Sequence, residues 1–335
     1  MSDNTLKNIL TKYDQKREAS IRDLEIRKRN LYFSNKDLEL IENQLTSFSI
    51  EISKSIINAN KEIKKNLIIE LEKKITELKN KKLSILKKLN IEPSFLEPYY
   101  ECEKCQDTGY ISDKYGSKMC ACLRQELLNN SYGTANLGNI SKDNFDNFNH
   151  LLYSDKINEE KYNSDISPRK NIEDIKETCL NFIDNFDNPE EKNLLFIGSP
   201  GLGKTFLSNC IAKELLERGK TVLYQTTPVL LDLIMNYKFN KGNISTEMYQ
   251  NIFSVDLLII DDLGTESINN LKFSELFTII NTRLLNQNNK ITKTIISTNL
   301  SLNAFMKTYD DRFVSRIVGH YNIGRFFGDD IRFKK

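Results

Sequence analysis

Eight consecutive residues, Gly198 to Thr205 (GSPGLGKT), have the composition of a phosphate-binding loop. Glycines let successive backbone N–H groups turn around a β-phosphate, Lys204 can reach the β- and γ-phosphates, and the Thr205 hydroxyl can bind Mg²⁺. An apolar run precedes the loop and a helical pattern follows it, so the loop opens a helix where anions bind favourably. A surface loop with a helix cap is the alternative, which this order of elements disfavours. The predicted nucleotide contacts are Gly198, Ser199, Pro200, Gly201, Leu202, Gly203, Lys204, Thr205 and Phe206.

Two acids follow a second apolar run, 255–260. Such a run is typical of a buried parallel strand, and ligands of open parallel sheets bind at the carboxyl ends of the strands. Asp261, together with Thr205, can therefore hold Mg²⁺, and Asp262 can orient or deprotonate an attacking water. A turn or a helix cap remains an equal interpretation of the acid pair taken alone.

Three polar residues further along the chain could complete this chemistry. Asn299 follows the next predicted strand and can hydrogen-bond a γ-phosphate or the attacking water, unless it only caps a turn. Arg312 and Arg316 are four residues apart, so on a helix they share one face, and a guanidinium stabilises charge on a transferring phosphoryl group. A salt bridge with one of the two preceding aspartates is the alternative role for these arginines.

Composition bounds the class of protein. The 335 residues allow about two domains, and a hydrophobic content of 39% is enough for at least one substantial core. A formal charge of +2 argues against a wholly basic coat for nucleic acid. No apolar run approaches the roughly 18 residues that span a membrane, and the polar start lacks a signal-peptide pattern. We therefore expect a cytoplasmic protein with no membrane partner.

Four of the six cysteines form two close pairs, Cys102 with Cys105 and Cys120 with Cys122. Two thiolate pairs separated by a short hairpin can converge on one tetrahedral Zn²⁺. Structural zinc is favoured over free thiols, and four sulfurs leave no open position for catalysis. The other two, Cys179 and Cys210, lie in helical patterns and are expected to be buried.

The hydrophobic pattern divides the chain into four parts. Residues 1–95 lack glycine and repeat apolar residues at helical spacing, with breaks expected near Ser34 and near Asn60. They form either a partner-docking domain or helices with merely solvated faces. In the polar linker, Phe145 and Phe148 could pack beside an adenine or anchor a domain edge. The predicted domains are 1–95 (helical), 96–128 (zinc-binding module), 129–170 (linker) and 171–335 (nucleotide-binding).

The last part alternates helices and strands, which predicts an α/β fold with a parallel sheet covered by helices on both faces. The expected strands are 194–197, 221–224, 257–260 and 294–297, and the main helices between them are 206–218, 228–237 and 273–287.

Residues 95–335 resemble an AAA+ ATPase, and more closely the bacterial DnaC/DnaI-type replicative helicase loaders. The motifs that carry this resemblance are GSPGLGKT (198–205), LLIIDDLGTE (257–266), ISTN (296–299), DRFVSRIVG (311–319) and the upstream cysteines. It implies ATP or ADP with Mg²⁺ as cofactor and Arg316, or else Arg312, as an arginine finger acting on a neighbouring subunit. A finger in trans needs self-association head to tail.

The resemblance also implies partners. The N-terminal region would bind the hexameric replicative helicase, and the AAA+ part would bind single-stranded DNA. Charged and aromatic residues suited to single strands occur together at Tyr237, Lys238, Phe239 and Lys241. A solvated loop is an equal interpretation of this segment.

Two departures from the AAA+ pattern qualify the resemblance. Asp262 stands where many AAA+ proteins carry Glu, which predicts slow hydrolysis and a switch-like ATPase. About twenty residues follow Arg316, too few for a full helical lid, a truncation that the loaders share; Arg325 or Arg332 could reach a nucleotide instead.

The leading functional hypothesis is an ATP-dependent loader of the replicative helicase onto single-stranded DNA. The first alternative is an IstB-like transposition helper ATPase, which would bind duplex DNA and a transposase. The second is a non-enzymatic adaptor in which nucleotide is structural. The helical arm and the cysteine module favour the loader.

Overall fold

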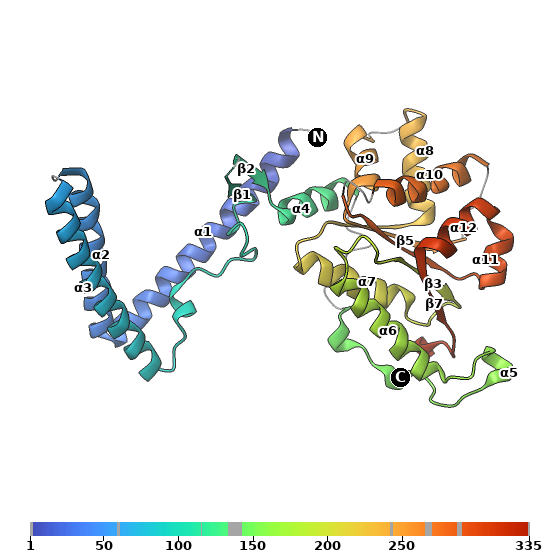
Figure 1. Cartoon of the computed structure of the whole chain (residues 1–335), viewed down its shortest axis with the longest axis horizontal. Coiled ribbons are helices and arrows are strands. Elements are labelled where there is room, and N and C mark those ends of the chain that lie inside the picture. Colours follow the sequence, from blue (N-terminus) through green and yellow to red (C-terminus); the bar gives the residue numbers. More distant parts are fainter. Residues whose placement is uncertain are drawn as a thin grey trace. The chain divides into compact units, whose positions relative to one another are not determined.

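The structure, a computed structural model, describes residues 3–58, 61–114, 116–132, 143–241, 244–264, 270–286 and 290–333. They divide into two compact units, one of Leu10–Lys118 and one of Met1–Ile9 with Met119–Lys335. Figure 1 shows the elements of both units. Within these described ranges, no helix is both long and apolar enough to cross a membrane.

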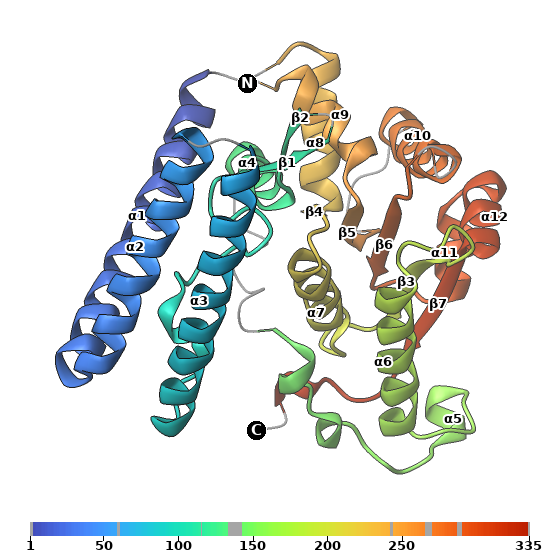
Figure 2. The same ribbon diagram turned by 60° about the vertical axis from the view of Figure 1, so that its left-hand side comes forward.

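The unit of Leu10–Lys118 is built on long helices. Its elements are α1 (Asp3–Ser34), α2 (Lys36–Asn58), α3 (Lys61–Lys88), the 3₁₀ turn η1 (Pro93–Leu96), and the hairpin of β1 (Tyr110–Asp113) and β2 (Gly116–Met119). Helices α2 and α3 form an antiparallel pair, as both views show (Figures 1 and 2). The predicted break at Ser34 is confirmed, whereas the one at Asn60 lies outside the described residues.

A small apolar core holds these helices. Leu38 on α2, Leu86 on α3 and Leu96 on η1 are buried against one another. Arg27 of α1 supports the turn beyond α3, because its guanidinium lies 4.0 Å from the Tyr99 ring centroid and donates to the carbonyl of Glu97 at 3.1 Å.

The second unit contains a five-stranded parallel sheet with the order β4-β5-β6-β3-β7, which confirms the predicted fold class. The strands are β3 (Asn193–Gly198), β4 (Val222–Thr226), β5 (Leu257–Leu263), β6 (Lys293–Thr298) and β7 (Tyr321–Phe326). The helices are α4 (Ala121–Tyr132), α5 (Glu159–Tyr162), α6 (Pro168–Asp184), α7 (Lys204–Glu217), α8 (Thr227–Lys238), α9 (Thr246–Ser254), α10 (Asn270–Asn286), α11 (Leu302–Thr308) and α12 (Asp311–His320).

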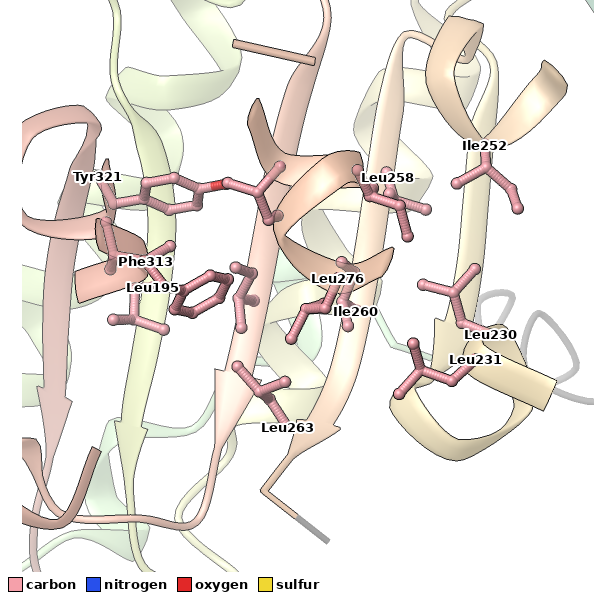
Figure 3. Close-up of a cluster of buried hydrophobic side chains, with 14 of the residues drawn as sticks. Leu195, Leu230, Leu231, Ile252, Leu258, Ile260, Leu263, Leu276, Phe313 and Tyr321 are labelled. Carbon is pink, nitrogen blue, oxygen red and sulfur yellow. The ribbon is translucent and has the colours of Figure 1, made fainter. Parts of the chain in front are cut away.

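Successive side chains of the strands enter different cores, because a strand repeats every two residues. Leu194 and Phe196 of β3 pack with α6 and α7, whereas Leu195 and Ile197 pack with α8, α10 and α12. Figure 3 shows this second core, in which Leu195 lies with Leu276 and Phe313 of the covering helices. Both sheet faces are therefore buried, as the continuous apolar runs predicted.

The segment 143–170, predicted to belong to a linker, packs on the nucleotide-binding unit. It contains the 3₁₀ turns η2 (Phe145–Asn147) and η3 (His150–Leu152) and the short α5. Tyr153 is only 5% exposed and belongs to the core beneath α6 and α7, with Phe148 packed at its border. Aromatic side chains thus anchor a polar stretch; the domain limits themselves remain predictions.

Candidate nucleotide site

The carboxyl ends of β3, β5 and β6 bring the predicted residues together. These strands are neighbours in the sheet, so the loop 198–205, the Asp261–Asp262 pair and Asn299 leave it at one edge. A cavity of about 450 Å³ lies there. Its lining comprises Pro200, Gly201, Leu202, Gly203, Lys204, Thr205, Phe206, Asp262, Asn299, Ile331 and Arg332. Three further predicted residues, Gly198, Ser199 and Asp261, lie outside the lining but hydrogen-bond to residues in it.

Glycine is required at two places in the loop by both backbone angle and space. Gly198 has φ +147° and Gly203 has φ +90°, values that favour glycine. A Cβ at Gly198 would lie 2.1 Å from the carbonyl oxygen of Phe326, and one at Gly203 would lie 2.6 Å from the Tyr153 hydroxyl. The loop therefore keeps its shape because β7 and Tyr153 press against it.

Lys204 lies deep in the site and is only 6% exposed. Its Nζ donates to the carbonyls of Gly198 at 2.6 Å and Ser199 at 2.9 Å and to Asn299 Oδ1 at 2.8 Å. The pKa of Lys204 is lowered to about 8, chiefly by burial and to a smaller extent by the charge of Arg332, while the two aspartates oppose this shift. A lysine at this depth is placed to meet a buried anion.

Asp261 is held by four donors from four elements. Its Oδ2 accepts from Tyr224 at 2.6 Å and Thr205 at 3.2 Å, and its Oδ1 accepts from the backbone of Asp262 at 3.0 Å and from the Ser297 hydroxyl. Burial and the Asp261 charge raise the pKa of Tyr224, so this hydroxyl stays protonated and donates. The carboxylate is thus fixed beside Thr205, the pair expected to serve Mg²⁺.

Tyr224 and Ser297 also belong to the site, although their sequence context did not indicate it. Both residues stand in strands that neighbour β5, close to the carboxyl ends of those strands. Whether a polar side chain there faces Asp261 depends on the register between the strands, which the sequence does not give. A polar residue near the end of an otherwise buried apolar strand is the signal that could have indicated them.

Asp262 leaves the strand and turns toward the cavity. The register between β5 and β6 shifts between Ile260 and Leu263, and Asp262 has φ +55°, a left-handed conformation uncommon outside glycine. Its Oδ1 accepts from Asn299 Nδ2 at 3.2 Å. Burial, and then the Asp261 charge, raise the pKa of Asp262. Strained backbone of this kind gathers at functional sites, and here it places a carboxylate and an amide side by side.

The arginines of α12 lie apart from this cavity. Asp310 caps the helix by accepting from the backbone of Phe313 at 2.8 Å, and burial of Phe313 and Ile317 turns Arg312 and Arg316 outward. The Arg312 side chain is 87% exposed, and its contact with Asp310 is long, at 4.0 Å. Neither arginine lines the nucleotide cavity of its own chain.

Phe145 and Phe148, suggested either to pack beside an adenine or to anchor a domain edge, lie against the core. The ring centroids of Phe148 and Phe206 are 6.5 Å apart, and Lys176 Nζ lies 4.8 Å from the Phe148 centroid. Both Phe145 and Phe148 pack at the border of the core. Phe206 contributes to the cavity lining, whereas the two phenylalanines do not.

The residues suggested for single-stranded DNA are partly engaged. Tyr237 stacks on Tyr249 with 4.3 Å between centroids, and Lys238 pairs with the buried Glu275. Phe239 is 57% exposed, and the Lys241 ammonium lies 6.0 Å from its ring centroid. Tyr237 and Lys238 therefore make contacts within the fold, whereas Phe239 and Lys241 lie at the surface.

The four paired cysteines do converge. The sulfur atoms of Cys102, Cys105, Cys120 and Cys122 all lie within 4.8 Å of one another. Tetrahedral Zn–S bonds of about 2.3 Å need sulfurs roughly 3.8 Å apart, so this set is compatible with structural zinc. The cysteines of α6 and α7, Cys179 and Cys210, are fully buried as predicted.

The donor set of the nucleotide site fits a magnesium–nucleotide complex. A hydroxyl and a carboxylate, Thr205 and Asp261, supply the hard oxygen ligands that Mg²⁺ prefers. The loop at the N-terminus of α7 and the Lys204 ammonium supply the donors and charge that phosphates require. These residues could hold the nucleotide and its metal without any rearrangement of the sheet.

Comparison with known proteins agrees with this geometry. A family profile described as "IstB-like ATP binding protein" matches residues 144–335. The replicative helicase loader DnaC of Escherichia coli K12 is 33% identical over 86 residues, 26% of this chain and 35% of that protein. DnaC of Buchnera aphidicola subsp. Baizongia pistaciae is 38% identical over 95 residues, 27% of this chain and again 35% of that protein. The chain thus matches about a third of the length of these relatives.

Among solved structures, the DnaC helicase loader has a TM-score of 0.44 at 24% identity, covering 57% of this chain and 99% of that one. DnaI has a TM-score of 0.43 at 20% identity, covering 56% and 93%. The family profile spans more than half of the sequence. The chain therefore belongs to the family of IstB-like ATP-binding proteins, with an AAA+ ATPase domain of the IstB/DnaC kind, as its motifs predicted.

Proposed function

We propose that this protein is an ATP-dependent loader that delivers a replicative helicase onto single-stranded DNA, with slow ATP hydrolysis as its switch. The observation that supports it most is the meeting of Lys204, Thr205, Asp261, Asp262 and Asn299 at one edge of a parallel sheet. Partial similarity to DnaC loaders supports the role in replication.

In the proposed mechanism, the loop N–H groups and Lys204 bind the phosphates, while Thr205 and Asp261 hold the metal. A Mg²⁺ ion held by these two residues would supply positive charge for the β- and γ-phosphates. Asp262 accepts a proton from the attacking water, and Asn299, hydrogen-bonded to both Lys204 and Asp262, orients that water. The raised pKa of Asp262 favours its role as a base, because proton transfer is most efficient when the pKa approaches the working pH.

A second copy of the chain would complete the site. Arg316, with Arg312 as the other candidate, projects from the outer face of α12 and would stabilise phosphoryl charge in a neighbour. Such a heterologous contact repeats head to tail and generates a ring or an open spiral.

Surface features of both units suit the proposed partners. Phe33, at the end of α1, is 82% exposed and Leu40 on α2 is 60% exposed, and burying such side chains against a partner would be favourable. We propose this pair as the helicase-docking surface, and Phe239 with Lys241 as the single-strand contact. A base can stack on an exposed ring while the lysine neutralises a phosphate.

Co-elution of the full chain with the replicative helicase of the same organism, in ATP and in ADP, tests the loader function. We expect a complex that Phe33→Ala weakens and Lys36→Ala leaves unchanged. Lys36 is the matched control because its side chain is similarly exposed, at 70%, but is not apolar. Lys204→Ala should abolish ATP-dependent loading onto a circular single strand. The matched control is Lys213→Ala on the same helix, since Lys213 pairs with Glu217 outside the cavity. A helicase that elutes alone in both nucleotides contradicts the proposal.

The match to an IstB-like family profile supports a second candidate, a transposition helper ATPase that binds duplex DNA and a transposase. ATP-dependent binding to duplex rather than single-stranded DNA, together with co-elution of a transposase instead of the helicase, would favour it. Helicase binding without ATP turnover, even with DNA present, would favour the adaptor.

A further inference from the structure

A groove of about 220 Å³ opens between α10 and the start of α12. Its lining comprises Phe273, Ser274 and Phe277 of α10, Asp310, which caps α12, and Arg312. The volume suits one aromatic ring, because a cavity of about 150 Å³ is enough to bind benzene. One of the two candidate arginine fingers therefore forms part of a groove the size of a phenyl ring.

An aromatic cluster lies beneath this groove. The Phe273 ring centroid lies 6.3 Å from that of Tyr309 and 5.9 Å from that of Phe313. Tyr309 and Phe313 are buried, whereas Phe273 and Phe277 are only partly buried, so aromatic surface reaches the groove. A further ring placed there would gain the edge and face contacts that aromatic side chains prefer.

Phe333 carries an apolar ring that its own chain leaves uncovered, because it is 85% exposed. It ends the 3₁₀ turn η4 (Ile331–Phe333), whose first two residues line the nucleotide cavity. The N–H of Ile331 donates to the carbonyl of Gly201 at 2.9 Å, which ties this turn to the phosphate-binding loop. An exposed aromatic side chain therefore stands at the edge of the nucleotide cavity, and burying it against a partner would be favourable.

Resting on the proposed head-to-tail assembly, we propose that Phe333 of one copy inserts into the groove between α10 and α12 of the next copy. If an arginine of α12 acts in trans, the surface around it meets the cavity of a neighbour. Phe333 directly follows the cavity residue Arg332, and the groove includes Arg312 itself. One interface can therefore seat the ring in the groove and bring the α12 arginines to the nucleotide.

The charges around the ring and the groove are complementary. Asp310 and Asp311 begin the helix beside the groove, and the sequence around Phe333, residues 332–335, is RFKK. Opposite charges across an interface steer the partners and fix their register. The ring and the groove are different surfaces of one chain, so the contact is heterologous and can repeat from copy to copy.

Sedimentation velocity of the full chain with Mg²⁺ and a non-hydrolysable ATP analogue tests the contact. Phe333→Ala removes the ring, and Ser274→Trp fills the groove from an exposed position of α10. Each should weaken self-association about tenfold or more, as expected for a buried aromatic anchor. The matched controls are Leu151→Ala, which removes a side chain that is 64% exposed, and Thr278→Trp, one helical turn after Ser274; neither residue lines the groove.

A mixture of the two variants makes the test directional. The Phe333→Ala chain keeps its groove and the Ser274→Trp chain keeps its ring, so the mixture should form pairs but no longer assemblies. In such a pair, the α12 arginines of the Phe333→Ala chain face the nucleotide site of the other chain. Adding Arg316→Ala to the Phe333→Ala chain should abolish the ATP hydrolysis gained on mixing, whereas adding it to the Ser274→Trp chain should not.

Wild-type self-association of Phe333→Ala or of Ser274→Trp would overturn this contact, as would a mixture that stays monomeric. The proposed loader would then still stand, because co-elution with the helicase tests it separately. Loss of that co-elution in Ser274→Trp alone, with unchanged self-association, would assign the groove to the helicase instead. A wild type that binds the analogue but stays monomeric refutes the contact between copies, whereas one that binds no nucleotide refutes the proposed function first.

Discussion

Replacing Gly198 by alanine tests whether β7 shapes the phosphate-binding loop. The new Cβ would lie 2.1 Å from the Phe326 carbonyl oxygen and 2.9 Å from its carbon, both backbone atoms of the adjacent strand. Overpacking costs about 1–3 kcal/mol, and a left-handed backbone at a residue with a Cβ costs roughly 1–2 kcal/mol more. We expect Gly198→Ala to lower the free energy of unfolding by about 2–5 kcal/mol, a large share of the stability of an ordinary domain.

Gly319→Ala is the matched control because a Cβ at Gly319, in α12, would meet nothing within 4 Å. Alanine is a better helix former, so this variant should be stabilised by about 0.5–1 kcal/mol. The chain has no tryptophan, so urea unfolding is followed by circular dichroism at 222 nm. A Gly198→Ala protein that unfolds within about 1 kcal/mol of wild type would refute the steric reasoning. It would mean that β7 yields to the loop rather than shaping it.

Three further predictions concern single groups. Because the pKa of free Lys204 is about 8 and the ammonium form binds phosphate, the affinity for nucleotide should be constant below that pH. Above pH 8 the affinity should fall about tenfold per pH unit, in titrations at pH 7 to 10. An affinity that does not change up to pH 10 would contradict this prediction. Purified protein should contain one zinc per chain by elemental analysis, lost in Cys105→Ser and kept in Cys179→Ala, which lies outside the cluster; a zinc content that Cys105→Ser leaves intact would exclude this site. Arg283 is fully buried and donates to the carbonyls of Val255 and Lys293, so Arg283→Lys, with fewer donors, should lower the free energy of unfolding by about 3 kcal/mol or more in urea; a loss under about 1 kcal/mol would show those carbonyls are satisfied otherwise.

The central residues of the site could be predicted because each of them lies near or shortly after the carboxyl end of a buried strand. Lys204, Asp261 and Asn299 needed only the rule that parallel strands present their carboxyl ends at one edge. Strand and helix limits were less accurate: the predicted helix 206–218 begins at Lys204, and the predicted strand 257–260 continues to Leu263. Hydrogen bonding of the loop into the first helical turn, and the bulge at Asp262, extend these elements beyond their apolar patterns.

The fifth strand of the sheet, β7, and the segment that follows it were not predicted as elements. β7 has the sequence YNIGRF, in which a glycine interrupts a pattern of alternating burial, so it lacks the continuous apolar run of the other strands. The position of Asp330 beside Gly201 depends on where β7 ends, and no local pattern indicates that. Arg332 was considered for the nucleotide from its type alone, whereas its place in the lining of the cavity became visible only in three dimensions.

The direct succession of α12 and β7 has a consequence for an assembly. His320 ends the helix that carries Arg316, and Tyr321 begins the strand whose last residue, Phe326, lies against Gly198. One continuous piece of backbone thus joins the outward arginines to the phosphate-binding loop of the same chain. If the proposed head-to-tail assembly forms, a movement of β7 on a change of nucleotide would also move α12 and its arginines relative to the next subunit. The nucleotide state of each subunit would then affect the site of the next subunit in one direction only. Hydrolysis could therefore proceed from subunit to subunit in order instead of at random.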